Sequence, residues 1–261
     1  MNYIGSKLSI LNYIDDTIQD FTKFSSDDII FCDIFAGTSS VGKYFKNKGY
    51  NVISNDIEYY SFVNAKHFIG NNEKITFDKL KKDGIEDGFE YLNKLNDKKG
   101  FIFKNYTISG TQNQEYERKY FTEENAIKID SIRDKIEEWK NIGLIEDNEY
   151  YYLITCLLEA SDKVANTASV YEAFLKNIKK SASKTMEIKP LEILTNDKNK
   201  KYLVTNKDAN LLINEITGDI LYMDPPYNTR KYDTNYHMLE TIALYDNPKI
   251  KGKTGVREET K

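Results

Sequence analysis

The chain has 261 residues, enough for one large domain or two modest ones, and its 40% apolar composition excludes an intrinsically disordered protein. Its net charge of −4 provides no overall basic field of the kind that indicates nucleic acid, although a local cationic groove can lie on an acidic protein. Because no apolar run reaches the length of a membrane span and no signal peptide is evident, we expect a cytoplasmic protein without membrane association.

The first residues predict the opening of an α/β sheet. Apolar side chains at helical spacing predict a helix over 7–20. An apolar strand over 29–35 leads into a turn over 36–40, and a helix follows from Val41. A second strand over 51–56 completes a strand–helix–strand unit, which is typical of an open, mostly parallel sheet with helices on its faces.

The middle of the chain interrupts this alternation. An aromatic and polar stretch over 101–122 predicts loops, and an amphipathic pattern predicts a helix over 123–143. The stretch over 148–180 predicts one long helix or two. Strand patterns resume over 201–208 and 218–224, which brings the predicted sheet to four strands.

The two cysteines, Cys32 and Cys156, fall in apolar strand and helix patterns, so buried thiols are favoured over a disulfide. The sequence contains no CxxC pattern and no cluster of His and Cys residues. A metal site is therefore not predicted.

The turn after the first strand, "DIFAGTSSVG" at 33–42, suggests a small-molecule site. Gly37 lets a ligand approach the backbone closely, and the helix that follows offers free N–H groups. The dinucleotide pattern GxGxxG and the phosphate-binding GKS/T are both absent, which favours a ligand without phosphates. Asp56, at the end of the second strand, is where such folds hold a ribose. An ordinary strand–helix turn is the alternative.

Acidic residues lie within or after each predicted strand. They are Asp33, Asp56, Asp208 and Asp224. The carboxyl ends of parallel strands meet at one edge of a sheet, and α/β proteins bind their ligands there. We therefore expect these four carboxylates along one edge.

The stretch "DPPY", Asp224 to Tyr227, ends the fourth strand abruptly. Pro225 has no N–H and a fixed φ, so its carbonyl can face a ligand without a competing donor. Together with Asp224 it offers two acceptors, which suit the two N–H groups of an exocyclic amine, and the ring of Tyr227 can stack on a planar base. Such hydrogen bonds would free the conjugated amino lone pair of adenine for attack on a sulfonium methyl group. The alternative is that the prolines only terminate the strand.

With these motifs the chain resembles the bacterial DNA adenine-N6 methyltransferases of the alpha group, which typically belong to restriction–modification systems. "NYIGSK" at 2–7 is similar to their first cofactor motif, "DIFAGTSSVG" to their glycine-containing loop and "DPPY" to their catalytic motif. The order of the motifs also matches, and the resemblance spans essentially the whole chain. It implies a Rossmann-like methyltransferase sheet, dependent on S-adenosylmethionine (SAM), with an inserted and mainly helical target-recognition region.

The resemblance implies a SAM-binding and catalytic domain formed by 1–71 and 196–261, with the target-recognition region over 72–195. These boundaries are set to within about 20 residues, and the helix over 148–180 is compatible with either part. The family sheet normally has seven strands, whereas four are predicted here, followed by a helix and a polar tail. We therefore expect a sheet that is incomplete at the C-terminus, in a fragment or in a chain that a second chain completes.

The resemblance further implies SAM as cofactor and a flipped adenine in double-stranded DNA as target. The implied catalytic residues are Asp224, Pro225, Pro226 and Tyr227. The implied cofactor-binding residues are Tyr3, Lys7, Asp33, Phe35, Gly37, Asp56 and Asp208. Of these, Asp33, Phe35 and Gly37 would contact the methionine end. Asp56 would hold the ribose hydroxyls, and Asp208 would face the adenine amino group.

Candidates for DNA contact lie in the insert and just after the DPPY motif. They are Gln112, Asn113, Gln114, Arg118, Arg230 and Lys231. Amide and guanidinium groups in the insert can contact bases in bidentate fashion, and Arg230 and Lys231 suit phosphates. A solvated polar loop is the alternative for 112–118. The lysines within 176–184 also suit phosphates, with a solvated helix end as the alternative.

Three functions remain open from the sequence. The first is adenine-N6 methylation of DNA. The second is amino methylation of another planar group: cytosine N4, RNA or a protein glutamine. The third is a catalytically silent module that binds SAM or DNA. Activity that disappears in Asp224→Ala would separate the first two from the third.

Overall fold

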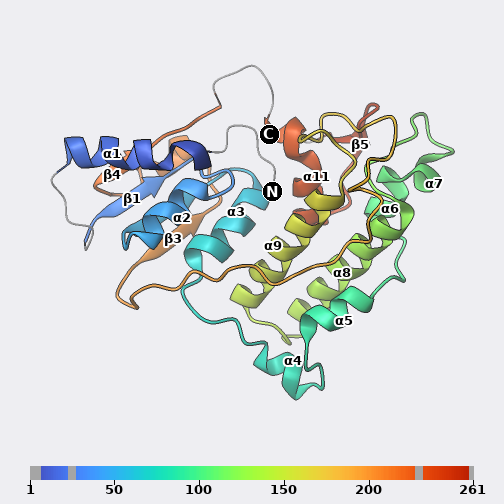
Figure 1. Ribbon diagram of the computed structural model, residues 1–261, viewed down its shortest axis with the longest axis horizontal. Helices are drawn as coiled ribbons and strands as arrows, with labels where there is room; N and C mark the ends of the chain where they lie inside the picture. Colours follow the sequence, from blue (N-terminus) through green and yellow to red (C-terminus); the bar gives the residue numbers. More distant parts are fainter. Residues whose placement is uncertain (1–6, 23–27, 227–231, 259–261) are drawn as a thin grey trace. The chain divides into compact units, whose positions relative to one another are not determined.

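The computed structural model describes residues 7–22, 28–226 and 232–258. The chain divides into two compact units (Figure 1). The first, here called the sheet unit, comprises residues 3–75 and 192–227. The second, the helical unit, comprises residues 76–191 and the described residues from 232 onward.

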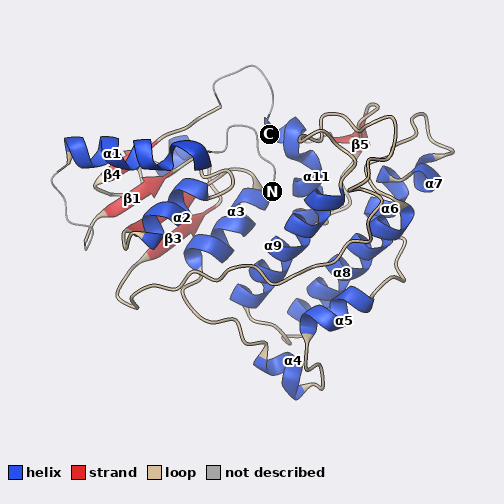
Figure 2. Ribbon diagram, viewed as in Figure 1, coloured by secondary structure: helices blue, strands red, loops and turns tan. Residues whose placement is uncertain are grey.

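Four parallel strands form the centre of the sheet unit, as predicted (Figure 2). They are β1 (Ile30–Asp33), β2 (Asn51–Asn55), β3 (Tyr202–Thr205) and β4 (Ile220–Tyr222), in the order β3-β2-β1-β4. In the middle of the sheet, Cys32 pairs with Ile53 of β2 and with Leu221 of β4. This order is that of the first four strands of a Rossmann-like sheet, so the predicted α/β fold class is confirmed.

Helices cover one face of this sheet. They are α2 (Ser40–Asn47) and α3 (Tyr59–Ala65), and α3 continues into the π-helix η2 (Lys66–Gly70). The ring of Phe31 in β1 stacks on Phe45 of α2, with 4.0 Å between the ring centroids. A Cβ atom added at Gly42 would lie 3.2 Å from the side chain of Ile69, so α2 and η2 approach each other closely at this glycine.

The remaining helices of the sheet unit are η1 (Leu8–Ile10), α1 (Leu11–Phe21) and α10 (Ala209–Leu212). The helix predicted near the N-terminus is therefore present. The buried carboxylate of Asp15 connects α1 to α2, because it accepts a hydrogen bond from the hydroxyl of Tyr44 at 3.0 Å and pairs with Lys48. On the opposite face of the sheet, Leu212 of α10 joins a small apolar cluster with Cys32.

The helical unit is built around two long helices, α8 (Glu123–Asn141) and α9 (Asp147–Val164). Its shorter elements are α4 (Asp78–Lys82), α5 (Gly88–Lys94), α6 (Phe101–Tyr106), α7 (Ile108–Thr111), α11 (Tyr232–Leu244), β5 (Ile250–Lys251) and β6 (Val256–Arg257). The predicted apolar face of α8 is buried; its members are Ile129, Ile132, Ile136 and Trp139. The predicted amphipathic helix is thus confirmed.

A buried arginine completes the packing of the helical unit. Arg133 of α8 donates hydrogen bonds to the carbonyls of Ile242 and Ala243, at 3.1 and 3.0 Å. These carbonyls belong to the last turn of α11, where a helix has acceptors without intrahelical partners. Arg133 therefore satisfies the end of α11 and fixes it against α8.

One sequence prediction was wrong in the helical unit, and two were incomplete. The stretch 101–122, predicted to be rich in loops, also contains the short helices α6 and α7, which its buried apolar residues form. The stretch 148–180 is neither one long helix nor two, because α9 ends at Val164 and an irregular segment follows. The polar C-terminal tail, for which no element was predicted, contains β5 and β6, which pair as an antiparallel hairpin separate from the four-stranded sheet.

The two compact units and the predicted domains divide the chain differently near its C-terminus. The segment from Asn228 groups with the helical unit, whereas 196–261 was assigned as a whole to the catalytic domain. The assignment of functions to these parts stays a prediction.

Among the described helices, none is both long and apolar enough to cross a bilayer. Both cysteines are free and buried, as expected.

Candidate active site at the carboxyl edge of the sheet

The strand order of the sheet reverses between β1 and β4. From β1 the chain crosses to β2 and β3 on one side, whereas β4 pairs with the other side of β1. Open α/β sheets bind ligands at such a switch point, in the crevice outside the carboxyl ends of the strands. The residues that follow β1 and β4 therefore lie where a ligand site is expected.

The turn after β1 has an unusual backbone. Gly37 and Ser39 have φ angles of 51° and 60°, in the left-handed region that glycine adopts without steric cost. The N–H of Ser39 donates to the carbonyl of Ala36 at 2.7 Å. The N–H of Gly37 donates to Oδ2 of Asp56 at 2.7 Å, and Oδ1 of Asp56 accepts the N–H of Glu58 at 2.9 Å. Asp56 therefore ties the turn after β1 to the end of β2.

Asp33, the last residue of β1, has a buried side chain that is 1% exposed. Its Oδ1 atom has no hydrogen-bond partner among the described residues, and the same holds for the buried hydroxyl of Ser39. Burial, joined by the negative charge of nearby Asp56 and Asp224, raises the pKa of Asp33 to about 7. Buried polar atoms without partners are rare in folded proteins, so both atoms are candidates for ligand contacts.

Asp224 follows β4 and forms an ion pair with Lys7. The distance from Oδ2 to Nζ is 2.6 Å, and the two side chains are 30% and 18% exposed. The pair brings the end of the NYIGSK stretch to the start of the DPPY stretch. Burial also raises the pKa of Asp56 to about 6. Carboxylates from the ends of three strands thus gather at this edge, with a lysine beside one of them.

Two other predicted cofactor-binding residues, Phe35 and Asp208, belong to the described part of the sheet unit, and their side chains differ in exposure. Asp208 is exposed at the start of α10, where its Oδ1 atom accepts the N–H of Asn210 at 2.8 Å. Phe35 is partly buried against the apolar cluster of α10. Among the described residues, no group of three or more His, Cys, Asp or Glu side chains is arranged so that it could hold a metal ion.

Sequence reasoning missed two residues at this edge. Ser39 was not singled out, although it stands in the Thr-Ser-Ser stretch directly after Gly37. Tyr222 pairs with Asp33 in the register of the sheet, and burial, with Asp224 and Asp33 adding to it, raises the pKa of its hydroxyl to about 12. The signal for Tyr222 was its position two residues before Asp224, since alternate residues of a strand share a face.

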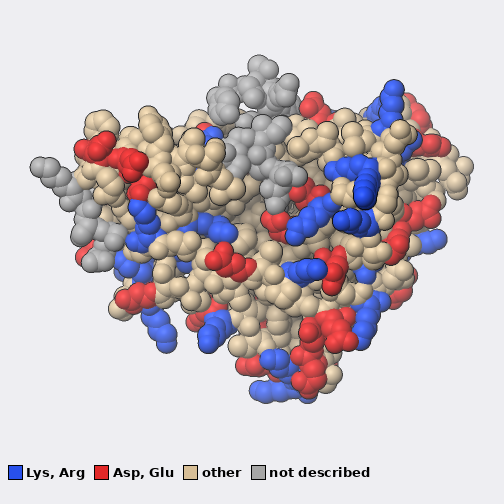
Figure 3. Space-filling model, in the orientation of Figure 1, with Lys and Arg blue, Asp and Glu red and all other residues tan. Residues whose placement is uncertain are grey.

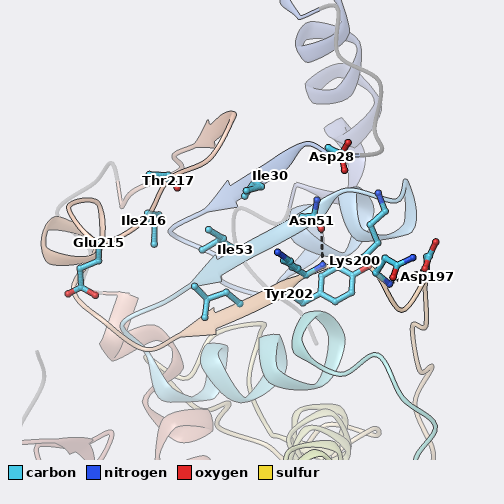
Figure 4. Close-up of a pocket in the computed structure, with 13 residues that line it drawn as sticks. Asp28, Ile30, Asn51, Ile53, Asp197, Lys200, Tyr202, Glu215, Ile216 and Thr217 are labelled. Carbon is cyan, nitrogen blue, oxygen red and sulfur yellow. Dashed lines mark hydrogen bonds between the residues drawn. The ribbon is translucent and has the colours of Figure 1, made fainter.

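A cavity of about 670 Å³ lies elsewhere on the sheet (Figure 4). Its wall includes Ile30, Ile53 and Ile216, and its other lining residues mostly begin or precede a strand, as do Asp28 and Asn51. It therefore opens toward the amino ends of the strands, on the face opposite to α2. None of the predicted site residues lines it.

Comparison with known proteins identifies the family. A family model described as D12 class N6 adenine-specific DNA methyltransferase matches residues 3–261. The chain belongs to this family. The resemblance inferred from the three motifs is thus confirmed, and with it an adenine-specific DNA methyltransferase that uses a methyl donor.

Several relatives of this methyltransferase are type II enzymes. It is 48% identical over 259 residues to the type II methyltransferase M.NlaIII of Neisseria lactamica, a match that covers 99% of this chain and 73% of the relative. It is 44% identical over 262 residues to M.FokI of Planomicrobium okeanokoites, covering 98% of this chain and 39% of the relative. It is also 44% identical over 262 residues to the modification methylase LlaI of Lactococcus lactis subsp. lactis, a match that covers 98% of this chain and 40% of the relative.

The chain therefore spans about three quarters of M.NlaIII but about two fifths of M.FokI and LlaI. No solved structure matches it with significance.

In this methyltransferase the predicted base-contacting residues of the insert differ in their surroundings. Gln112 and Asn113 are exposed in the turn after α7. Gln114 is also exposed, and its Nε2 atom donates to the carbonyl of Lys104 at 3.1 Å. Arg118 is buried, with 5% exposed.

The guanidinium of Arg118 is occupied within the helical unit. It donates to the carbonyls of Gly252, Lys253 and Asn105 at 3.0, 3.3 and 3.3 Å, and to Oε1 of Gln114 at 2.9 Å. Since these bonds hold the β5–β6 turn, Arg118 is positioned as a structural residue rather than as a reader of bases. Four other predicted residues lie outside the described part of the chain: Tyr3, Tyr227, Arg230 and Lys231.

Proposed function

We propose that this chain transfers the methyl group of SAM to N6 of an adenine that is flipped out of a specific sequence in duplex DNA. One observation carries the proposal: Asp224 of the DPPY motif lies near the buried Asp33 at the switch point of the sheet, and Asp56 lies near Asp33 as well. The catalytic motif and the turn for a small-molecule ligand thus share one edge. The membership of the D12 family supports the same reaction.

The residues at this edge fit SAM. The methionine end of SAM carries an ammonium group, which suits the unpartnered Oδ1 atom of the buried Asp33. The left-handed turn at Gly37 allows a ligand to approach the backbone. Asp56 accepts two backbone N–H groups, and a carboxylate has further lone pairs to accept from the ribose hydroxyls. Lys7, Phe35 and Asp208 would complete the pocket.

When bound, SAM supplies a methyl group on a sulfonium ion. Asp224 and the carbonyl of Pro225 would accept the two N–H groups of the adenine amine, which localises the lone pair on N6 and orients it toward the methyl carbon. Tyr227 would stack on the flipped base. A carboxylate can accept several hydrogen bonds, so Asp224 can keep its ion pair with Lys7 while it holds the amine. Lys7 would then help to orient the carboxylate of Asp224 toward the amine.

DNA contact belongs to the same proposal. Gln112 and Asn113 are exposed and carry the amide groups that contact adenine in the major groove. We assign base contact to these two and a supporting role to Gln114, while Arg230 and Lys231 would contact phosphates. A DNA target also implies the cytoplasm of a bacterial cell. The expectation that a second chain completes the sheet has no support in the structure or in the relatives.

The decisive experiment is transfer of labelled methyl from SAM to mixed-sequence duplex DNA, with the modified nucleoside identified by mass spectrometry. We expect N6-methyladenine, and its loss in Asp224→Ala. N4-methylcytosine would favour the second candidate, which the same pair of acceptors could serve. SAM binding without transfer would favour a module that binds its ligands but lacks activity by itself.

A further inference from the structure

The segment that follows α9, residues 166–184, is here called the lysine segment. It contains four lysines and a single acidic residue, Glu172, in a chain whose net charge is −4. The lysines are Lys176, Lys179, Lys180 and Lys184. It is not the end of a helix, because α9 stops at Val164 and the segment has an irregular backbone with one bridge, between Thr167 and Phe174.

The backbone of the lysine segment is held by a buried asparagine. The side chain of Asn166 donates to the carbonyls of Lys119 and Leu175 at 3.0 and 3.1 Å. Its Oδ1 atom accepts the N–H of Lys179 at 3.0 Å, and its own N–H donates to the carbonyl of Tyr120 at 2.8 Å. A single buried side chain thus fixes the backbone at Leu175 and Lys179, next to the first lysines of the segment.

A buried tyrosine fixes the same segment a second time. The hydroxyl of Tyr171 donates to Asp162 of α9 at 3.0 Å, and its N–H donates to the carbonyl of Asn235 at 2.8 Å. Its carbonyl accepts from the hydroxyl of Tyr120 at 2.6 Å and lies 3.0 Å from Nε2 of His237. The segment is therefore an ordered surface without regular secondary structure, so little conformational entropy remains to be lost when it binds a partner.

The lysines of this segment differ from other lysines of the helical unit. Six of those form ion pairs with carboxylates: Lys79, Lys94, Lys98, Lys135, Lys140 and Lys189. In contrast, Lys176, Lys180 and Lys184 are exposed and have no carboxylate within 4.0 Å among the described residues. Lys179 donates to the carbonyl of Thr167 at 2.7 Å, which holds the loop. Figure 3 shows basic side chains gathered over the gold loop of Figure 1.

We propose that Lys176, Lys180 and Lys184 bind phosphates of the DNA duplex that carries the target base. This inference rests on the proposed function, which requires duplex DNA to bind an acidic protein. Association with DNA gains free energy when lysines replace the counterions condensed on phosphates, and lysines already paired with carboxylates gain less from it. The lysine segment supplies unpaired cations on a fixed backbone, as a phosphate-binding surface requires.

The test compares two triple variants that change the same charge. The first is Lys176→Gln, Lys180→Gln and Lys184→Gln in one chain. The matched control is Lys79→Gln, Lys94→Gln and Lys98→Gln, which removes three paired lysines of the same unit. Dissociation constants for two duplexes of unrelated sequence are measured between about 50 and 200 mM salt, the range in which phosphate contacts change affinity most visibly.

Each phosphate contact contributes about −0.9 to the slope of log K against log salt. In the first variant the slope should therefore be less steep than in the wild type by about 2 to 3. Its affinity should fall by at least about tenfold, equally for both duplexes, because phosphates carry no sequence information. The control should lose less than about 1 in slope. Equal slopes for the two variants, a wild-type slope in the first variant, or no salt-dependent DNA binding by the wild type would each overturn the proposal.

The binding assay also separates this inference from the proposed function. If the slope changes as expected while the wild type transfers no methyl group, the phosphate-binding surface stands and the proposed chemistry fails. If the wild type methylates DNA but the lysine variant binds with an unchanged slope, the chemistry stands and the surface is wrong. An unchanged affinity for SAM in both variants shows that the sheet unit is intact.

Discussion

The sheet has two places that could hold a ligand, and they differ in almost every respect. At the carboxyl ends of the strands, Asp33, Asp56 and Asp224 gather around a left-handed turn. Toward the amino ends lies a cavity of about 670 Å³ with Ile30 and Ile53 in its wall. A large apolar pocket is the usual first hypothesis for a binding site in a protein of unknown function. Strand direction favours the acidic edge instead, because ligands of open α/β sheets bind outside the carboxyl ends.

The two places also differ in the kind of buried polar atom that lacks a partner. At the acidic edge a buried carboxylate oxygen and a buried hydroxyl lack partners in the described chain. At the cavity the buried hydroxyl of Tyr202 also lacks a partner among the described residues, while Asn51 accepts the N–H of Lys201 at 2.8 Å. A buried carboxylate oxygen without a described partner is found only at the acidic edge of the two, and it suits a cationic ligand. The apolar wall belongs to the face of the sheet where Leu203 remains 47% exposed. Parallel sheets normally carry cover on both faces, so exposed aliphatic residues there indicate a stretch of sheet that the described residues leave uncovered rather than a catalytic site.

The largest effect is expected for Asp224→Ala. Loss of this acceptor should lower kcat for methyl transfer by about 10²–10³-fold, because one of the two groups that localise the amine lone pair is gone. The affinity for SAM should change by less than about threefold, since the proposed partner of Asp224 is the target base rather than SAM. Single-turnover methylation and equilibrium SAM binding would measure the two quantities separately.

A matched control for that substitution lies at the opposite end of β4. Asp219 directly precedes the strand, and its Oδ2 atom accepts the N–H of Ile30 at 2.8 Å. Asp219→Ala should keep methyl transfer within about threefold of the wild type, as exposed substitutions away from a site usually do. Equal losses of methyl transfer in Asp224→Ala and Asp219→Ala would contradict a catalytic role confined to the carboxyl ends of the strands.

The next effect is a pH dependence of SAM binding that is due to Asp33. Its pKa is raised to about 7, so below that pH most of the folded protein carries a neutral carboxyl group. The ammonium group of SAM prefers the ionised form. Affinity should therefore rise with pH, by up to about tenfold per unit below pH 7, and level off above it.

In the Asp33→Asn variant this pH dependence should disappear, and SAM should bind about as weakly as it binds the wild type at low pH. Isothermal titration between pH 5.5 and 8.5 covers the pKa given by burial and by the neighbouring carboxylates. An Asp33→Asn variant with an unchanged pH profile would assign the titration to another group, with Asp56 and its pKa of about 6 the first to examine.

A smaller effect is expected for Asp56→Ala. The variant loses a charged acceptor for the ribose hydroxyls and for the N–H groups of Gly37 and Glu58, so SAM affinity should fall about tenfold. A cofactor analogue that lacks a ribose hydroxyl tests the contact directly. The wild type should bind this analogue more weakly than SAM, whereas Asp56→Ala should bind both equally. Unequal binding by the variant would remove the ribose contact from the proposal.

The parts of the molecule also differ in how much of their structure could be predicted from the sequence. All four strands, α2 and the acidic residues at the sheet edge were predicted from local patterns, because strand alternation and strand ends are encoded by neighbouring residues. The ion pair between Lys7 and Asp224 could not be predicted, since it joins segments more than 200 residues apart. The same applies to Arg118, whose polar sequence context indicated a reader of bases while tertiary contacts bury it.

The irregular segment after α9 was the least predictable. A run of apolar and charged residues at helical spacing indicated continued helix over 165–180. Asn166 instead binds backbone groups of Leu175 and Lys179, which a helix would have paired internally. Competition from an asparagine side chain for backbone partners is a known cause of helix termination, but its distant acceptors are visible only in the folded chain.

The smallest effect is expected at the cavity, for Leu203→Asn. Leu203 is half exposed in β3 and lines the cavity, so the substitution changes the wall without unpacking the core. Because the cavity lies at the amino ends of the strands, kcat and SAM affinity should stay within about twofold of the wild type. Lys201→Gln at the same cavity should behave likewise. A loss of tenfold or more in either variant, with an unchanged melting temperature, would mean that the cavity takes part in function and that strand direction alone misplaces the site.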